Sequence, residues 1–406
     1  MSPRPRRILP VIVLSQLAGT SLWFAGNAVL PDLQSRLGLP DSALGHMTAA
    51  VQLGFIAGTL VFAVLAISDR YSPRATFLAC ALLGAACNAS TYFVDGKIAL
   101  LLAARFAVGF FLAGIYPAGM KIASGWYRHD LGRALGFLVG AMVLGTALPH
   151  LIRGLGQSLP SALPSGLPWE WVMVSVSAIA AAGGFLMYAL VPDGPYLVPG
   201  AKFDPRALAT IFRSAGFRAS SFGYFGHMWE LYAFWAFVPP LLAAYAAHSA
   251  EPGLNISIMS FWVIAAGAIG SVVGGYLSLR FGSARVGFAQ LAASGLCCLL
   301  SPLMFYAGPL LFIPFLLFWG IVVVGDSPQF SALNARYAPP DQVGSALTAA
   351  NCIGFAISIV SIQLLNVAAS GIPAQALFLL LVPGPILGLW ALRPLLLGNG
   401  TEPPGP

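Results

Sequence analysis

Four side chains that can carry a charge or a proton stand inside long apolar runs of this sequence. They are the acids Glu230 and Asp326, the imidazole of His227 and the guanidinium of Arg105. Ionisable groups are costly in an apolar medium and are functional candidates there. A carboxyl or imidazole group can carry a proton, and a guanidinium can hold an anion. We therefore predict that these four residues serve proton coupling, and that Arg105 and His227 also contact the substrate.

Spacing along helices limits how these groups can meet. His227 and Glu230 are three residues apart, so in a helix they share a face and can interact. At about 1.5 Å per residue they lie roughly 14 and 18 Å from the start of that helix, near the middle of a bilayer. Asp326 precedes Pro328 in a stretch where an irregular helix is expected, and an acid there can pair with Arg105 or face a cavity. The structural alternatives are satisfied core groups for Glu230 and His227, and a carboxylate latch for Arg105.

Uncharged polar and aromatic side chains in the same runs are candidates for lining a wet cavity. Amides, hydroxyls and indole N–H groups hold polar solutes by hydrogen bonds, although any single aromatic ring is more often a packing residue. The predicted substrate-binding residues, besides Arg105 and His227, are Gln16, Thr20, Asn27, Gln52, Tyr116, Trp229, Tyr232, Gln329 and Asn351.

Metal and cofactor chemistry finds little support. His46-Met47 and His227-Met228 place an imidazole beside a thioether, a donor pair that suits copper. Methionine at helical spacing usually fills a core, and the five cysteines lie in apolar runs without metal-site spacing. The sequence also has neither a phosphate-binding Gly-rich loop nor a nucleophile elbow. We predict no metal, no cofactor beyond a coupling proton, and no enzymatic activity.

Composition identifies the elements that must position these residues. Of 406 residues, 58% are hydrophobic and only 8% are charged, against about 25% charged in a soluble domain. So little charge cannot cover a water-facing surface, which excludes a soluble enzyme, a nucleic-acid-binding protein and a disordered chain. A membrane-spanning helix needs ~20 apolar residues, so the chain can form about twelve. The predicted spans are 8–30, 43–67, 75–94, 98–122, 133–153, 170–191, 218–246, 255–279, 286–306, 309–335, 343–368 and 373–393.

Basic residues predict the orientation. Most arginines and lysines fall in segments on the side of both termini, whereas only Arg36, Lys97 and Arg153 fall in segments on the other side. Basic loops mark the cytoplasmic side, so we predict a multi-pass protein of a bacterial-type inner membrane with both termini in the cytoplasm. The net charge of +7 then reflects topology and not nucleic acid.

An internal repeat divides the chain into two halves. Gly109 and Pro117 recur as Gly320 and Pro328, each at an offset of 211. Between the halves, 192–217 is rich in proline and glycine and ends in a short amphipathic stretch. We predict an all-α integral membrane protein with twelve transmembrane helices. Residues 1–191 and 218–406 form two six-helix bundles related by a pseudo-twofold axis, and residues 192–217 form a cytoplasmic linker.

The sequence resembles the major facilitator superfamily over essentially its whole length. Leu65-Ala-Ile-Ser-Asp69-Arg70-Tyr-Ser-Pro-Arg74 is similar to the family's loop between helices two and three, and Arg280 stands in the weaker second copy. Arg105-Phe-Ala-Val-Gly109 is similar to a helix-four element that the family associates with proton coupling. The resemblance implies that Asp69, Arg70, Arg74 and Arg280 act in gating, with the first three bridging to helix eleven.

The resemblance implies transport by alternating access. We expect a monomeric secondary active transporter in the lipid bilayer that takes up a small polar solute, an anion among the candidates, with protons. Helices five and eleven are weakly similar to those of nitrate/nitrite porters and cyanate permeases, although the arginines that nitrate porters use on helices two and eight are missing. The alternatives are a non-transporting assembly factor or sensor of the same fold, a lipid flippase, a drug exporter and a copper transporter.

Overall fold

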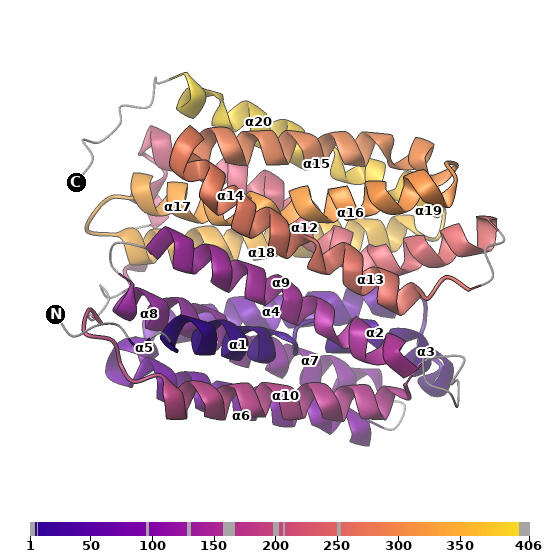
Figure 1. Ribbon diagram of the computed structural model, residues 1–406, viewed down its shortest axis with the longest axis horizontal. Helices are drawn as coiled ribbons and strands as arrows, with labels where there is room; N and C mark the ends of the chain where they lie inside the picture. The colour runs from indigo at the N-terminus through magenta and orange to yellow at the C-terminus, as the bar shows by residue number, and fades with distance from the viewer. Residues whose placement is uncertain are drawn as a thin grey trace.

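The computed structural model describes residues 5, 7–94, 97–127, 131–156, 167–197, 203–205, 208–249 and 253–397. Its regular elements, within these ranges, are helices that run roughly along one long axis (Figure 1). Helix α1 begins and α20 ends at the same end of the bundle, which we call the termini end; the opposite end is the distal end. Eleven helical segments are long and apolar enough to cross a membrane, and the shorter apolar helix α1 accompanies them.

The first half packs as one layer, coloured indigo to magenta in Figure 1. Its elements are α1 (Ile8–Thr20), α2 (Ala25–Ala28), α3 (Leu30–Leu37), α4 (Ala43–Val64), α5 (Ile67–Arg70), α6 (Pro73–Ala89), η1 (Ser90–Phe93), α7 (Ile98–Leu112), α8 (Tyr116–Trp126), α9 (Leu131–Leu155) and α10 (Trp169–Leu190).

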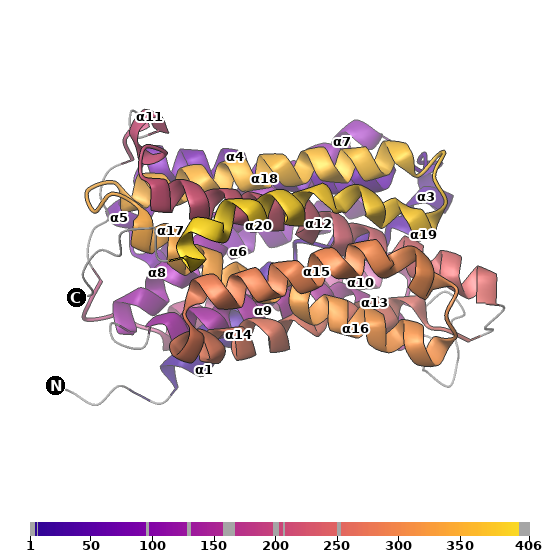
Figure 2. The same ribbon diagram turned by 90° about the horizontal axis from the view of Figure 1, so that it is seen from above.

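The second half forms the other layer, drawn in pink, orange and yellow. Its elements are α11 (Leu208–Ile211), α12 (Ala215–Ser249), α13 (Ile256–Ala265), α14 (Gly267–Phe281), α15 (Ser283–Phe305), α16 (Pro309–Gly325), α17 (Ser327–Tyr337), α18 (Val343–Ala368), α19 (Ala374–Leu377), η4 (Phe378–Leu381) and α20 (Pro383–Leu396). The two layers meet where α4 packs on α18 and where α9 packs on α13 and α14; α4 and α18 lie side by side in Figure 2.

The predicted first span, 8–30, is not one continuous helix. Helix α1 ends at Thr20, and two short helices follow after a turn. The hydroxyl of Thr20 donates to the Gln16 carbonyl at 2.8 Å, and that of Ser21 donates to the Ala18 carbonyl at 2.6 Å. Hydroxyls that bond back along a helix tend to bend it. The irregularity expected near Asp326 is present, because α16 ends at Gly325 and α17 begins at Ser327.

The sequence repeat has a packing reason. A Cβ on Gly109 would lie 2.0 Å from the backbone oxygen of Val51, and a Cβ on Gly320 would lie 1.9 Å from that of Val263. Only glycine lets α7 touch α4, and α16 touch α13, at this distance. The repeated glycines therefore mark the same close helix crossing in both halves.

We expect Gly320→Ala to destabilise the fold by about 1–3 kcal/mol, because the added methyl group must push two backbones apart. Thermal denaturation of the purified protein measures the effect. Gly275→Ala is the matched control, since a Cβ at Gly275 meets no atom within 4 Å. Equal losses in the two variants would show that the crossing does not depend on glycine.

The linker between the halves is partly visible. Residues 198–202 and 206–207 of the predicted linker lie outside the described residues. Helix α11 is one turn long, and Ile211 packs with Phe217, Ala346 and Ala350 in a small apolar cluster. The Ile211 side chain of α11 therefore packs against the second half.

Candidate functional site

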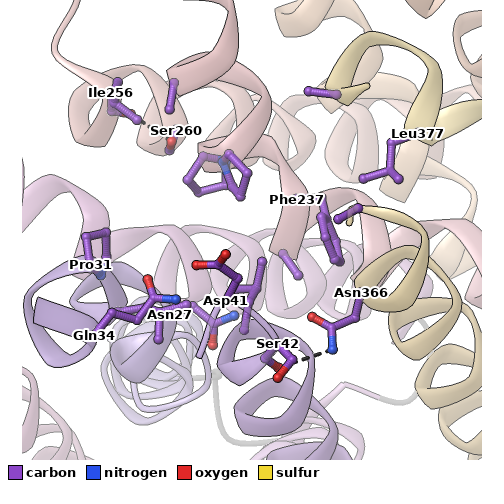
Figure 3. Close-up of a pocket in the computed structure, with 18 of the residues that line it drawn as sticks. Asn27, Pro31, Gln34, Asp41, Ser42, Phe237, Ile256, Ser260, Asn366 and Leu377 are labelled. Carbon is purple, nitrogen blue, oxygen red and sulfur yellow. Dashed lines mark hydrogen bonds between the residues drawn. The ribbon is translucent and has the colours of Figure 1, made fainter. Parts of the chain in front are cut away.

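A cavity of about 1020 Å³ lies between the two halves at the distal end. Helix ends from both halves line it, and Figure 3 shows Asn27 and Asp41 of the first half facing Phe237 and Asn366 of the second across the hollow. The wall of α12 is apolar, with Phe237 followed by two prolines, whereas the segment from α2 to the first turn of α4 contributes amides, a hydroxyl, a carboxylate and the imidazole of His46. Such a cavity fits a solute with a polar head and some apolar surface.

A cationic corner of this cavity comes from α9. Arg153 and His150 line the cavity one helical turn apart. The Arg153 side chain donates to the Ala28 carbonyl and lies 2.9 Å from the Asp32 carboxylate, whereas its Nε has no partner among the described residues. His150 is 2% exposed, and its Nε2 likewise has no described partner. The Nε–H of Arg153 and the Nε2 atom of His150 are therefore free to hydrogen-bond a polar group of a ligand at this corner.

Sequence analysis missed this corner. Arg153 was interpreted as a topological charge, and His150 was not singled out. The one available signal was the spacing of a histidine and an arginine three residues apart on a predicted span. Because a histidine at a helix end is common, the spacing alone did not distinguish a cavity residue from a core residue.

Among the predicted substrate residues, Asn27 lines the cavity, and its amide donates to Thr48 at 2.8 Å. Four rings in mutual contact lie deeper, from Trp23 and Phe55 of the first half and Tyr232 and Phe355 of the second. We call these four residues the aromatic plug. Ring centroids are 5.6 Å apart for Trp23 and Tyr232 and 4.5 Å apart for Phe55 and Phe355. All four rings are buried, so the plug closes the space between the halves.

A hydrogen-bond chain runs through the same level. The Trp23 indole donates to the Gln52 oxygen at 3.3 Å, and the Gln52 amide donates to Ser358 of the second half at 3.4 Å. Of the predicted substrate residues, Tyr232 is thus part of the plug and Gln52 is bonded to it. Both connect the two halves and do not line open space.

The remaining predicted substrate residues lie on the termini side of the plug or away from the interface. Tyr224 donates to Asn351 at 3.2 Å, and Gln16 is buried with both amide atoms unpartnered among the described residues. Tyr116 is close enough to Tyr224 for their electrostatic interaction.

Trp229, in contrast, donates to the Leu380 carbonyl within the second half. The residues that pack within one half are Thr20, Trp229 and Gln329, which faces Gly287.

The charged residues of the second half form a fully buried cluster. His227 Nδ1 lies 2.8 Å from Asp326 Oδ1, and both side chains are 0% exposed. Glu230 accepts from Ser294 at 2.9 Å and from the Cys298 thiol at 3.6 Å, and its other oxygen has no described partner. His227 and Glu230, which the helical spacing allows to interact, thus have different partners in this structure. Although the two residues share a face of α12, His227 points to the α16–α17 break and Glu230 points to α15.

Arg105 is buried in the first half beside neutral groups. It is 1% exposed and donates to Asn88 at 2.7 Å and to Thr91 at 3.4 Å, while Nε and Nη1 have no described partner. The expected pair with Asp326 is not formed, because Asp326 binds His227 in the other half. A guanidinium without a carboxylate in a buried setting can take an anion.

The residues predicted to gate bind partners near their own helices. Asp69 pairs with Lys121 on α8, and Arg74 lies 3.9 Å from Asp193, just beyond α10. The partner expected on helix eleven is thus replaced, in this structure, by partners in the first half or next to it. Arg70 is exposed, and Arg280 lies 5.2 Å from the Phe281 ring. Gating by these four residues stays a prediction.

We expect Asp69→Asn to lower transport strongly while leaving membrane insertion unchanged, because the substitution removes the charge that holds the α4–α6 turn against Lys121. Uptake per inserted molecule measures the effect. Arg280→Ala, in the weaker second copy, should lower uptake less than Arg70→Ala. Normal flux in Asp69→Asn would exclude a gating role for this loop.

Neutral hydrogen bonds connect the halves at the distal end. The Gly45 amide donates to the Asn366 side chain at 3.2 Å, and that side chain donates to the Ser42 carbonyl at 3.1 Å. On the other side of the cavity, the Asn255 side chain donates to the Gly154 carbonyl at 3.1 Å. These contacts can break without separating charges. Among the described residues, the ion pairs lie inside the halves instead: Arg36–Glu170, Asp69–Lys121 and Asp32–Arg153 in the first, and His227–Asp326 in the second, while Arg74 reaches Asp193 at the start of the linker.

Eleven helical segments long enough to span a membrane and the shorter apolar helix α1 form two halves with a cavity between them at one end. This architecture is typical of a multi-pass α-helical membrane transporter. The sequence profile of the Major Facilitator Superfamily matches residues 12–362. The chain therefore belongs to the Major Facilitator Superfamily.

Two solved structures share the fold. The human organic anion transporter MFSD10 (TETRAN) is 17% identical with a TM-score of 0.68, and the match covers 97% of this chain and 100% of that one. The transporter FucP, in the outward conformation, is 15% identical with a TM-score of 0.66, and the match covers 95% and 97% of the two chains. No curated protein sequence matches the chain at a significant level.

Proposed function

We propose that the protein is a proton-coupled secondary transporter that takes up a small polar solute with an anionic group from the distal side. The observation that carries this proposal is the cavity between the halves, whose cationic corner at His150 and Arg153 has unused polar atoms. Both termini are then cytoplasmic and the distal end faces outward, which agrees with the distribution of basic residues along the sequence.

The proposed path runs from the distal cavity to the termini side. A solute first meets Asn27 and the cationic corner, and it passes further only when the aromatic plug parts. Gln16 and the Tyr224–Asn351 pair lie beyond the plug and offer the next hydrogen bonds. The interface favours such a movement, because its distal contacts are neutral hydrogen bonds and the ion pairs named above move with their own half. Rocking of two halves around a central site is the usual mode of such duplicated folds.

An anionic group on the solute fits Arg153, the one arginine of the described cavity lining, on the wall away from the carboxylate of Asp41 that Figure 3 labels. Arg153 borders the cavity, and Arg105 lies buried in the same half without a carboxylate partner among the described residues. That one structural neighbour is an organic anion transporter agrees with this assignment, but at 17% identity it supports the fold more than the substrate. The solute is expected to be organic, because Phe237 and the prolines of α12 give the cavity an apolar wall.

Proton coupling is proposed for the second half. Glu230 has a hydroxyl, a thiol and no described cation as partners, so burial is less costly when its carboxyl group is neutral. Asp326 faces His227 and is close enough to Glu230 for an electrostatic interaction. A proton on one member of this cluster changes the cost of charge on the others. Proton uptake and release there can thus bias the packing of α12 against α15 and α17.

Reconstituted vesicles test the function. Purified protein is first screened by thermal shift against small organic and inorganic anions, and the best ligand is then offered as a labelled solute with and without an inward pH gradient. We expect accumulation that requires the gradient and disappears with a protonophore. Ligand-dependent stabilisation without any flux would favour a non-transporting sensor, and lipid scrambling without solute flux would favour a flippase.

A further inference from the structure

A second hollow, of about 630 Å³, lies on the outer side of the second half at the termini end. It runs between the first turns of α12 and the last turns of α20, which pack closely against each other (Figure 2). Two alanines of α12, Ala215 and Ala219, have small side chains that leave the space. The hollow is separate from the cavity between the halves and shares no lining residue with it.

The wall of this groove is apolar and uncovered. Phe222, Leu387 and Trp390 line it and are 51%, 63% and 67% exposed. In a membrane-spanning chain, large apolar side chains with this exposure face hydrocarbon and not water. The groove is therefore open to the bilayer, and an acyl chain fits along its wall.

The mouth of the groove is cationic. Arg218 stands near the start of α12 and Arg393 in the last turn of α20, and both are exposed. One N–H of Arg218 donates to the Phe212 carbonyl at 2.8 Å, and the other donors of its guanidinium remain available for a ligand. The described lining contains no acidic side chain. Because both arginines lie at helix ends on the same side, they stand at the level of lipid headgroups.

We propose that this groove binds one anionic phospholipid of the leaflet at the termini end. Arg218 and Arg393 hold the phosphate, for which guanidinium geometry is well suited, and one acyl chain lies along Phe222, Leu387 and Trp390. Basic pockets between spanning helices are suited to anionic headgroups. A second copy of the chain fits less well, because a twofold contact through this face would bring the arginines of one copy against those of the other.

Lipid titration of the purified full chain tests the proposal. Thermal stability and lipid retention in native mass spectrometry are measured with phosphatidylglycerol and with phosphatidylcholine of the same acyl chains. We expect a preference of about tenfold or more for phosphatidylglycerol, since each arginine near a headgroup contributes to anionic binding. The Arg218→Gln/Arg393→Gln variant should bind both lipids equally. Arg280→Gln/Arg285→Gln, which changes exposed arginines at the same end outside the groove, should keep the preference.

Further variants distinguish binding of the headgroup from binding of the acyl chain. If the double glutamine variant does not fold, Arg218→Lys/Arg393→Lys keeps the charges and should keep part of the preference, whereas Trp390→Ala should weaken retention of both lipids. Equal binding of the two lipids by the unmodified chain would overturn the proposal. Three other results would also overturn it. Inorganic phosphate could stabilise the protein as much as phosphatidylglycerol does, or the protein could form a dimer that the arginine substitutions dissociate. The preference for phosphatidylglycerol could also be seen only after residues 398–406 are removed.

Discussion

Glu230→Gln is expected to abolish the solute accumulation that a pH gradient drives, while solute binding and exchange of solute for solute continue. Glutamine keeps the size of the side chain and can still bond Ser294 and Cys298, but it cannot take up a proton. The variant therefore stays packed against α15 with an uncharged side chain at position 230 throughout the cycle. Accumulation and counterflow in the same vesicles measure the two halves of this prediction.

The matched control is Asp341→Asn. Asp341 is an exposed acid between α17 and α18, so its loss removes a carboxylate outside the buried cluster and outside the distal cavity. We expect that variant to accumulate solute normally. Full gradient-driven accumulation in Glu230→Gln would exclude Glu230 as the coupling residue and move the assignment to Asp326. Loss of binding as well would make Glu230 a structural or substrate-contacting group.

Arg153→Gln should weaken solute binding by about tenfold to a hundredfold, which corresponds to about 1.4–2.8 kcal/mol. The reason is that Arg153 is the cation at the wall of the distal cavity, and a charge-assisted hydrogen bond to an anionic group is among the stronger single contacts. His150→Ala should weaken binding less, because its imidazole has one free nitrogen and can form one hydrogen bond with the solute. Arg36→Gln, which changes a distal arginine outside the cavity lining, is the control. A Kd unaffected by Arg153→Gln would remove the corner from the substrate site.

The same corner predicts a pH dependence. Asp32 lies on α3, beyond the spanning helices, where burial raises the pKa of its carboxyl group, Arg153 opposes that effect and Glu170 adds to it. A raised pKa means that Asp32 takes a proton at a higher pH than a free aspartate. As the pH on the distal side falls through that value, Asp32 becomes neutral and Arg153 is released for an anionic solute. The affinity for the solute should therefore rise when the distal side is acidified. The Asp32→Asn variant should bind the solute tightly both above and below the pKa of Asp32.

Much of the architecture could be predicted without coordinates. With 8% charged residues, the chain has to satisfy its backbone inside hydrocarbon, and helices achieve this locally. The offset between Gly109 and Gly320 predicted a duplicated unit, and both glycines make the same backbone contact in their own half. The break at Asp326 followed from the nearby proline. These features depend on neighbours in sequence or on composition, which is why they are readable there.

The buried charges could be named from the sequence, but their partners could not. Glu230, His227, Asp326 and Arg105 are all buried, as their apolar surroundings indicated. Which of them meet depends on how each helix is rotated and on which neighbour it packs against. His227 reaches Asp326 rather than Glu230, and Arg105 reaches Asn88 on α6, because these contacts cross between helices. A helical spacing of three only makes a pair geometrically allowed.

What the sequence by itself determined is the class of this protein: a duplicated bundle of membrane-spanning helices with few charges inside. Only the tertiary structure decided where a solute can enter. The distal cavity is formed by the ends of helices from both halves, so no single stretch carries its signature, and His150 and Arg153 face it only because α9 is turned that way. Other polar residues of the predicted spans seemed equally suited to contact a solute. Packing places one of them, Gln52, against the aromatic plug and not in the open cavity.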